Sequence, residues 1–169
     1  MEKEVIIKPT FDVKSTFNAT LLVLMSTKLK LYSLFLLAII SINLFSNFAL
    51  EEKIDIISII TPFLIFPTII LLSVFFIYRS TKKQIEENPR LKENIVYILN
   101  NEYFQEKGDS FEIKHFWKNI IKVVEKKEYF LIYVAKNKAN FIRKSDLKNT
   151  QYDELKELLS SLNIKKSLK

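Results

Sequence analysis

Few residues of this 169-residue chain belong to the types that perform chemistry. The absence of cysteine excludes disulfides and thiolate metal sites, and a single glycine, Gly108, cannot build a glycine-rich phosphate loop. The one histidine, His115, lacks a partner at a recognisable catalytic spacing, and we interpret it as a surface residue. No carboxylate pair, metal-ligand cluster or activated nucleophile is visible. We therefore predict a protein that is not an enzyme, with no cofactor, metal or small-molecule substrate.

Binding is the chemistry that remains, and basic and aromatic side chains are its candidates. The net charge is +7, and a basic group surrounds one predicted turn: Lys136, Lys138, Arg143, Lys144 and Lys148. Beside a membrane, each such side chain can contribute about 1 kcal/mol of attraction to anionic headgroups. The same charges also fit the ordinary excess of cytoplasmic Lys and Arg and the needs of solubility, and both interpretations stay open. No nucleic-acid-binding motif accompanies them, so we expect no nucleic acid partner.

Trp117 is the other candidate contact. Its first interpretation is a core anchor, with the indole N–H bonded to a backbone carbonyl, and its second is a contact to a partner or ligand. The predicted set of partner or lipid-headgroup contacts is Trp117, Lys136, Lys138, Arg143 and Lys144.

Two apolar runs indicate where these candidate side chains would lie relative to a membrane. Residues 31–50 and 56–78 contain no charged side chain, are separated by five residues, and each approach the ~20 residues that a helix needs to cross a bilayer. Lys28, Lys30, Arg79, Lys82 and Lys83 flank the runs on the outside, against Lys53 alone between them. We therefore predict a transmembrane helical hairpin over residues 31–78, multi-pass in a cell (inner) membrane, with both termini cytoplasmic. The frequent use of Lys, Ile, Asn and Phe is typical of a bacterial protein from an AT-rich genome.

Polar residues inside the runs are predicted to pack the two helices together: Asn43, Asn47, Ser58 and Thr61. Hydrogen bonds of this kind contribute ~0.6 kcal/mol each. A polar path for an ion is the alternative, but two helices cannot enclose one. Pro67 is expected to bend the second helix.

The N-terminal segment, residues 1–30, carries a short strand signal at 4–8 that Pro9 ends. Asp12 is expected to cap a helix that begins at Val13. This helix, over residues 13–27, either lies at the cytoplasmic surface or on the soluble domain, or continues into the first span. The strand is expected to add an edge to the sheet of the soluble domain.

A second domain follows a juxtamembrane linker, residues 79–93, where Asn88-Pro89 is expected to end the helix. From residue 94 the apolar period shifts towards 2, which predicts strands at 95–99, 103–107, 110–114, 120–126, 129–134 and 139–143. Gly108-Asp109 is the expected hairpin turn, and 150–162 reads as an amphipathic helix. The fold class predicted for 94–169 is a small α+β domain, an antiparallel barrel or sandwich closed by a C-terminal helix.

This order of elements resembles the YcxB-like family of bacterial membrane proteins. The matching residues are Trp117-Lys118-Asn119-Ile120, then Glu128-Tyr129-Phe130-Leu131, and finally Ala139-Asn140-Phe141-Ile142-Arg143. The resemblance implies a C-terminal domain similar to the pleckstrin-homology (PH) fold, with antiparallel strands capped by one helix. It implies no catalytic residues.

The function expected from these observations is non-enzymatic. The cytoplasmic domain would bind a protein partner or self-associate at the membrane face, with membrane lipid as its other contact. The alternative is a membrane-embedded immunity protein that neutralises a membrane-active toxin or bacteriocin. A transporter or channel subunit is disfavoured because the spans hold no ionisable group.

Overall fold

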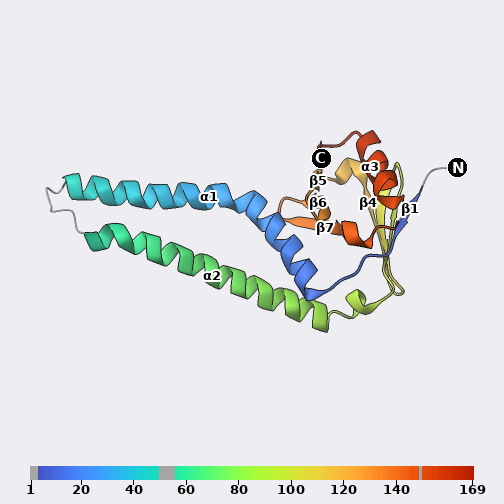
Figure 1. Ribbon diagram of the computed structural model, residues 1–169, viewed down its shortest axis with the longest axis horizontal. Coiled ribbons are helices and arrows are strands. Elements are labelled where there is room, and N and C mark those ends of the chain that lie inside the picture. The colour runs from blue at the N-terminus through green and yellow to red at the C-terminus, as the bar shows by residue number, and fades with distance from the viewer. Residues whose placement is uncertain (1–3, 50–55, 149) are drawn as a thin grey trace.

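The computed structural model of the protein describes residues 4–49, 56–148 and 150–169. Two long helices, α1 (Val13–Ala49) and α2 (Ile56–Glu87), project from one side of a small α+β domain (Figure 1). The predicted loop between the apolar runs lies outside the described residues.

The first sheet has four antiparallel strands in the order β1-β2-β3-β4. Strand β1 (Val5–Ile7) comes from the N-terminal segment and pairs with β2 (Val96–Leu99), followed by β3 (Tyr103–Lys107) and β4 (Glu112–Phe116). Val5 and Ile7 are buried while Ile6 is exposed, as the alternation of a strand requires. The N-terminal strand is therefore an edge of the domain sheet, as the sequence predicted, although the two long helices separate it from β2.

The second sheet has the order β7-β6-β5-β8. Strands β5 (Lys122–Glu125), β6 (Tyr129–Ala135) and β7 (Lys138–Arg143) are antiparallel and correspond to the last three predicted strands. Strand β8 (Lys166–Ser167) runs parallel to β5 and was not predicted. Two polar, exposed residues carry no apolar alternation, so the sequence held no signal for it.

The main core lies between the two sheets and helix α3 (Gln151–Ser161). Leu155 and Leu159 of α3 are completely buried against it, together with large side chains of both sheets such as Phe104 and Phe130. Full burial of side chains of this size contributes about 1.5–3 kcal/mol each. The predicted closing helix is thus confirmed and seals the space between the sheets.

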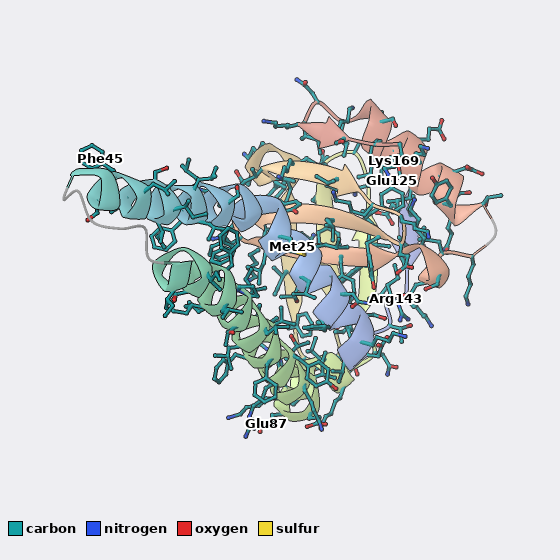
Figure 2. The ribbon with its side chains drawn as sticks, turned by 60° about the vertical axis from the view of Figure 1, so that its left-hand side comes forward. Met25, Phe45, Glu87, Glu125, Arg143 and Lys169 are labelled. Atoms are coloured by element: carbon teal, nitrogen blue, oxygen red, sulfur yellow. The ribbon has the colours of Figure 1, made fainter. Side chains whose placement is uncertain are left out.

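Helix α1 joins the domain to the helix pair. Ala19 and Val23 are buried against Tyr129 and Phe141 of the second sheet, in a cluster separate from the main core. Beyond Met25 the helix changes direction and runs beside α2 (Figures 1 and 2). The two interpretations of residues 13–27 are therefore both realised, because this segment packs on the domain and also continues into the first apolar run.

The two long helices touch through aromatic rings. Phe17 meets Tyr78 edge to face at 5.4 Å between ring centroids, and Tyr32 meets Phe66 at 6.3 Å. Within the described residues, one helical stretch, Phe63–Glu87, is long and apolar enough to cross a membrane. Tyr32–Ser46 is a shorter apolar stretch of α1. Helix α2 continues through Pro67 to Glu87.

Two predicted turns are present. Helix α2 stops at Glu87, and the Asn88 side chain accepts a hydrogen bond from the Arg90 N–H at the start of a 3-10 turn, Pro89–Lys92. At the β3–β4 turn, a Cβ atom on Gly108 would lie 2.5 Å from the Phe111 ring. The single glycine therefore stands where the turn leaves no room for a side chain.

Candidate functional site

Four residues of the predicted basic group form two pairs, and the fifth, Lys148, is exposed beyond the end of β7. Lys136 and Lys138 are exposed at the β6–β7 turn, and their ammonium groups have no ion-pair partner in the described part of the chain. Arg143 and Lys144, at the other end of β7, are each held by carboxylates. The sequence analysis assigned these four residues to one contact surface. In the structure, only Lys136 and Lys138 of the four are without an ion pair among the described residues.

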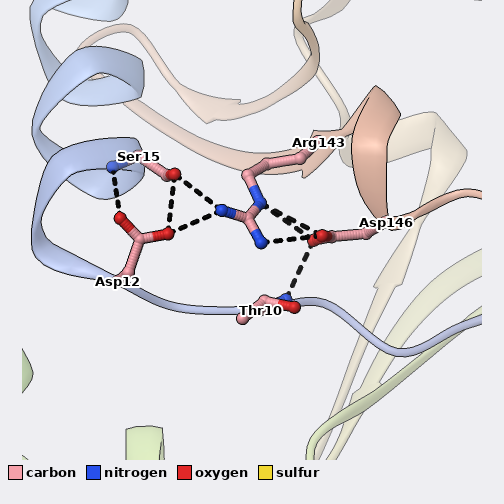
Figure 3. A network of polar contacts seen from close by, with 5 residues as sticks. All are labelled: Thr10, Asp12, Ser15, Arg143 and Asp146. Atoms are coloured by element: carbon pink, nitrogen blue, oxygen red, sulfur yellow. Dashed lines mark hydrogen bonds and ion pairs between the residues drawn. The ribbon is translucent and has the colours of Figure 1, made fainter.

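Arg143 occupies the centre of a polar network (Figure 3). Its Nη1 atom donates to Asp12 Oδ2 at 2.6 Å and to Ser15 Oγ at 2.7 Å, and its Nη2 atom donates to Asp146 Oδ1 at 2.8 Å. Asp146 also accepts from the backbone N–H of Thr10 at 2.9 Å. The network joins strand β7 to the first turn of α1 across 131 residues of sequence.

Asp12 has a second role in the same network. Its Oδ1 atom accepts the backbone N–H of Ser15 at 2.8 Å, which confirms the predicted helix cap. Burial alone would raise the pKa of the Asp12 carboxyl, but hydrogen bonds from Ser15 and the charge of Arg143 outweigh it and lower the pKa below its usual value. Hydrogen bonding to Asp146 raises the pKa of Arg143. Asp12 and Arg143 are therefore both charged at neutral pH.

Lys144 belongs to a different network, whose centre is the buried carboxylate of Glu125. Glu125 has only 1% of its side chain exposed. Its Oε1 atom accepts from Lys144 Nζ at 2.5 Å and from the Tyr152 hydroxyl at 2.8 Å. The backbone N–H of Lys169 donates to its other oxygen at 2.8 Å. Figure 2 shows Glu125 and Lys169 side by side near the end of the chain.

These contacts set the protonation of Glu125. Burial alone would raise its pKa, but the hydrogen bonds from Lys144, the Lys169 backbone and Tyr152 lower the pKa to about 2. The carboxylate thus stays charged and fixes both the end of β7 and the C-terminal segment.

Trp117 is a core anchor. It is buried, and its indole Nε1 donates to the carbonyl of Asn100 at 2.7 Å. This confirms the first interpretation of Trp117 and removes the residue from the surface that a partner can reach.

The structure describes only some of the polar side chains in the apolar runs. The side chains of Asn43, Asn47 and Ser58 lie outside the described ones. The Thr61 hydroxyl donates to the carbonyl of Ile57 at 2.7 Å, inside its own helix, and Thr68 and Ser73 do the same. Donation within the helix satisfies these hydroxyls without a bond to the neighbouring helix.

A polar bridge links the two sheets, and it was not predicted from the sequence. Glu106 Oε1, on β3, lies 3.0 Å from His115 Nε2 on β4 and accepts from Asn140 Nδ2 on β7 at 2.5 Å. The His115 ring is stacked on Phe104, with 5.7 Å between centroids. His115 is therefore half-buried, and its interpretation as a plain surface residue was wrong. The alternation of β3 and β4 carried the signal, since His115 pairs with the buried Phe104.

The bridge borders a cavity of about 360 Å³. Its walls come from four parts of the chain: the first turns of α1, the last turn of α2, the first sheet and the β6–β7 hairpin. Most of the lining is apolar, as at Val23, Ile85 and Phe141. Glu106, Lys138 and Arg90 are the charged residues that line it.

The described residues contain no group of three or more His, Cys, Asp or Glu side chains placed to hold a metal ion. The arrangement offers instead a domain with a lined cavity, an exposed lysine pair and two charge networks.

Comparison with known proteins finds one family similarity, which lies in the C-terminal domain. No curated protein and no solved structure matches the chain significantly. A family model described as YcxB-like protein matches residues 99–159, from strand β2 into helix α3. That segment contains the residues quoted for the resemblance, but not the two apolar runs that were also part of it. The resemblance of the C-terminal domain to the YcxB-like family is thereby confirmed.

Proposed function

We propose that this protein is a non-enzymatic bacterial inner-membrane protein that presents an interaction domain at the cytoplasmic membrane face. Helices α1 and α2 form a transmembrane hairpin, both termini are cytoplasmic, and the domain binds a protein partner or a second copy of itself.

The surface of α2 supports insertion in a membrane. Leu64, Leu71 and Phe76 each expose between 63% and 69% of their surface, which is typical of side chains that contact lipid. Lys and Arg residues gather where the helices meet the domain, as the positive-inside rule requires of a cytoplasmic domain.

The arrangement of the domain supports a PH-like fold. Two antiparallel sheets enclose one core, and a single helix, α3, closes it near the end of the chain. The hairpin is inserted between the first and second strands of this domain.

The Arg143 network is the observation that carries the proposal. It ties the first turn of α1 to strand β7, so the domain is held in a defined orientation relative to the helices (Figure 3). A fixed orientation is useful to a protein that must present one surface to a partner at the membrane. Two surfaces are available: the Lys136 and Lys138 pair, and the edge of the first sheet, where Phe116 is 45% exposed.

In-cell photocrosslinking of the full chain tests this proposal. Photoreactive residues replace Lys138 and Phe116 in turn, and a probe at the exposed Asn163 serves as the control position. A discrete protein adduct at Lys138 or Phe116, absent at Asn163, would support the proposal, and its mass would distinguish a partner from a second copy. An adduct with a membrane-active toxin would favour the immunity function instead. Lipid adducts alone would contradict a protein partner.

Topology is tested separately with reporter fusions. We expect a periplasmic reporter to be active at residue 53 and a cytoplasmic reporter to be active at the C-terminus. Cytoplasmic activity at residue 53 would overturn the hairpin.

A further inference from the structure

The cavity described above has the size of a ligand site. Its volume of about 360 Å³ lies within the range of small-molecule sites, roughly 300–1,000 Å³. It lies between α1 and the two sheets, and the polar bridge at Glu106 lies in its wall. This volume lies near the lower end of that range, which favours one alkyl chain over the two chains of a phospholipid.

One polar atom in the wall lacks a partner. The Oγ1 atom of Thr16 is buried and makes no hydrogen bond within the described residues. A buried hydroxyl without a partner costs free energy, and because this atom is closed to water in the structure, the turn of α1 at Thr16 would have to open for a ligand atom to complete its hydrogen bond.

The charges around the cavity favour an anion. Lys138 lines it with no ion-pair partner among the described residues, and Arg90 lies over the Phe111 ring at 5.5 Å. The one carboxylate in the lining, Glu106, is already shared by His115 and Asn140. Lys138 therefore has no described carboxylate of its own, whereas the charge of Arg90 also acts on the neighbouring Glu93 carboxylate.

The position of the cavity relative to the helices indicates where such a ligand would come from. Leu24 and Ile85 both line it, and each is within two helical turns of the point where its helix leaves the apolar run. This step rests on the proposed function, because it takes the helices to be embedded in a bilayer.

We infer that the cavity binds a single-chain anionic amphiphile, a fatty acid or a lysophospholipid. Its chain lies between α1 and the sheets, and its charged head lies against Lys138 and Arg90.

The test uses the full chain in lipid nanodiscs. Two probes are compared, a palmitic acid analogue and a lysophosphatidylglycerol analogue, each carrying a diazirine and an alkyne. After illumination, mass spectrometry maps the labelled peptides. We expect label in residues 16–24 and 138–141 in addition to the bilayer background in residues 63–78. An excess of unlabelled palmitate or lysophosphatidylglycerol should remove only the cavity label.

Matched variants sharpen the test. Ala139→Phe fills the cavity and should abolish its label, whereas Ala135→Phe places the same ring at an exposed position outside the lining. Because a larger residue at 139 also presses on the core, Lys138→Glu provides a second variant that changes only charge. We expect Lys138→Glu to reduce the cavity label roughly two- to fivefold and Lys136→Glu to leave it unchanged.

The outcomes are distinct. Cavity label from one probe only would identify the source of the amphiphile and support the inference. Equal label from an uncharged monoacylglycerol probe would overturn the anionic head, and span label without cavity label would overturn the site. Absence of label from residues 63–78 would instead overturn the membrane hairpin itself.

Discussion

Arg143 and Lys144 are neighbours in sequence, yet they hold different parts of the molecule together. Arg143 reaches Asp12 and Asp146 and ties the second sheet to α1, whereas Lys144 reaches Glu125 and ties it to the C-terminal segment. The environments differ in part, since 45% of the Asp12 side chain is exposed, whereas Asp146 at 6% and Glu125 at 1% are both buried.

This difference separates two roles for ion pairs. An exposed pair contributes little to folding because water competes for it, and its main effect is to fix geometry. A buried carboxylate that loses its cation is costly, because its charge remains in a medium that cannot solvate it. The exposed Arg143–Asp12 pair therefore mainly orients α1 on the domain, whereas the buried Glu125 network and the Arg143–Asp146 pair stabilise the domain.

The largest effect is expected from Lys144→Ala. It leaves Glu125 buried without its nearest cation and should lower the free energy of unfolding of the domain by about 3 kcal/mol. Urea titration of the full chain in detergent, followed by Trp117 fluorescence, measures this, since Trp117 is the only tryptophan and is buried in the domain. Lys148→Ala is the control, with an expected change within about 0.5 kcal/mol. A change below about 1 kcal/mol for Lys144→Ala would mean that Tyr152, the C-terminal segment and Lys156, whose ammonium lies 4.0 Å from Glu125, suffice for this carboxylate.

Acid should weaken the same network. The pKa of Glu125 is about 2 in the folded protein against an ordinary value of 4.5, so folding favours the charged form. The stabilisation is fully present above the unfolded pKa and is lost as the pH falls through 4.5 towards 2. Between pH 7 and pH 3 the loss attributable to this group is about 2 kcal/mol. Urea midpoints across this range measure it.

The Glu125→Gln variant isolates this contribution. Because glutamine does not titrate, the variant should be less stable at pH 7 and lose less stability on acidification than the parent protein. Identical pH dependence in both proteins would assign the acid sensitivity to other carboxyls, of which Asp12 is one with a lowered pKa.

Arg143→Ala should produce a smaller change in stability and a larger change in local order. We expect a loss of about 2 kcal/mol, because the Asp12 side of the network is exposed to water but the Asp146 carboxylate is buried and loses its cation. Amide hydrogen exchange should accelerate in the first turns of α1, near Ser15, while the core around Trp117 stays protected. Arg143→Lys should resemble Arg143→Ala in exchange, since one ammonium group cannot reproduce the fork that reaches two carboxylates. Unchanged exchange near Ser15 would show that Ala19 and Val23 alone hold α1 on the domain.

The strands and helices could be predicted from the sequence better than the two networks could. Strands β2 to β7, the closing helix and the cap at Asp12 follow from local patterns: period-2 alternation, turn residues and helix signals. These signals lie within a few residues of the elements that they specify. The N-terminal strand was predictable on the same grounds as an edge, since Pro9 ends it.

The networks were not predictable because their partners are distant. Asp12 and Arg143 are separated by 131 residues and Asn140 and Glu106 by 34, and no local pattern joins them. For the same reason, the basic side chains around the β6–β7 turn appeared as one group. Only the fold shows which of them face carboxylates and which face solvent.

The smallest effect on stability is expected at the other end of β7, where Lys136 and Lys138 serve as the reference for an unpaired lysine. Replacement of either residue by alanine should change the free energy of unfolding by less than about 0.5 kcal/mol, because neither side chain has an ion-pair partner among the described residues. The same urea titration measures this change against Lys144→Ala. If Lys138→Ala destabilised the domain as strongly as Lys144→Ala, then Lys138 would be part of the framework, and the division of the basic group into a structural pair and a free pair would be wrong. A stable Lys138→Ala protein with altered crosslinking would instead confine this residue to binding, since an exposed lysine can be lost from a surface without cost to the core beneath it.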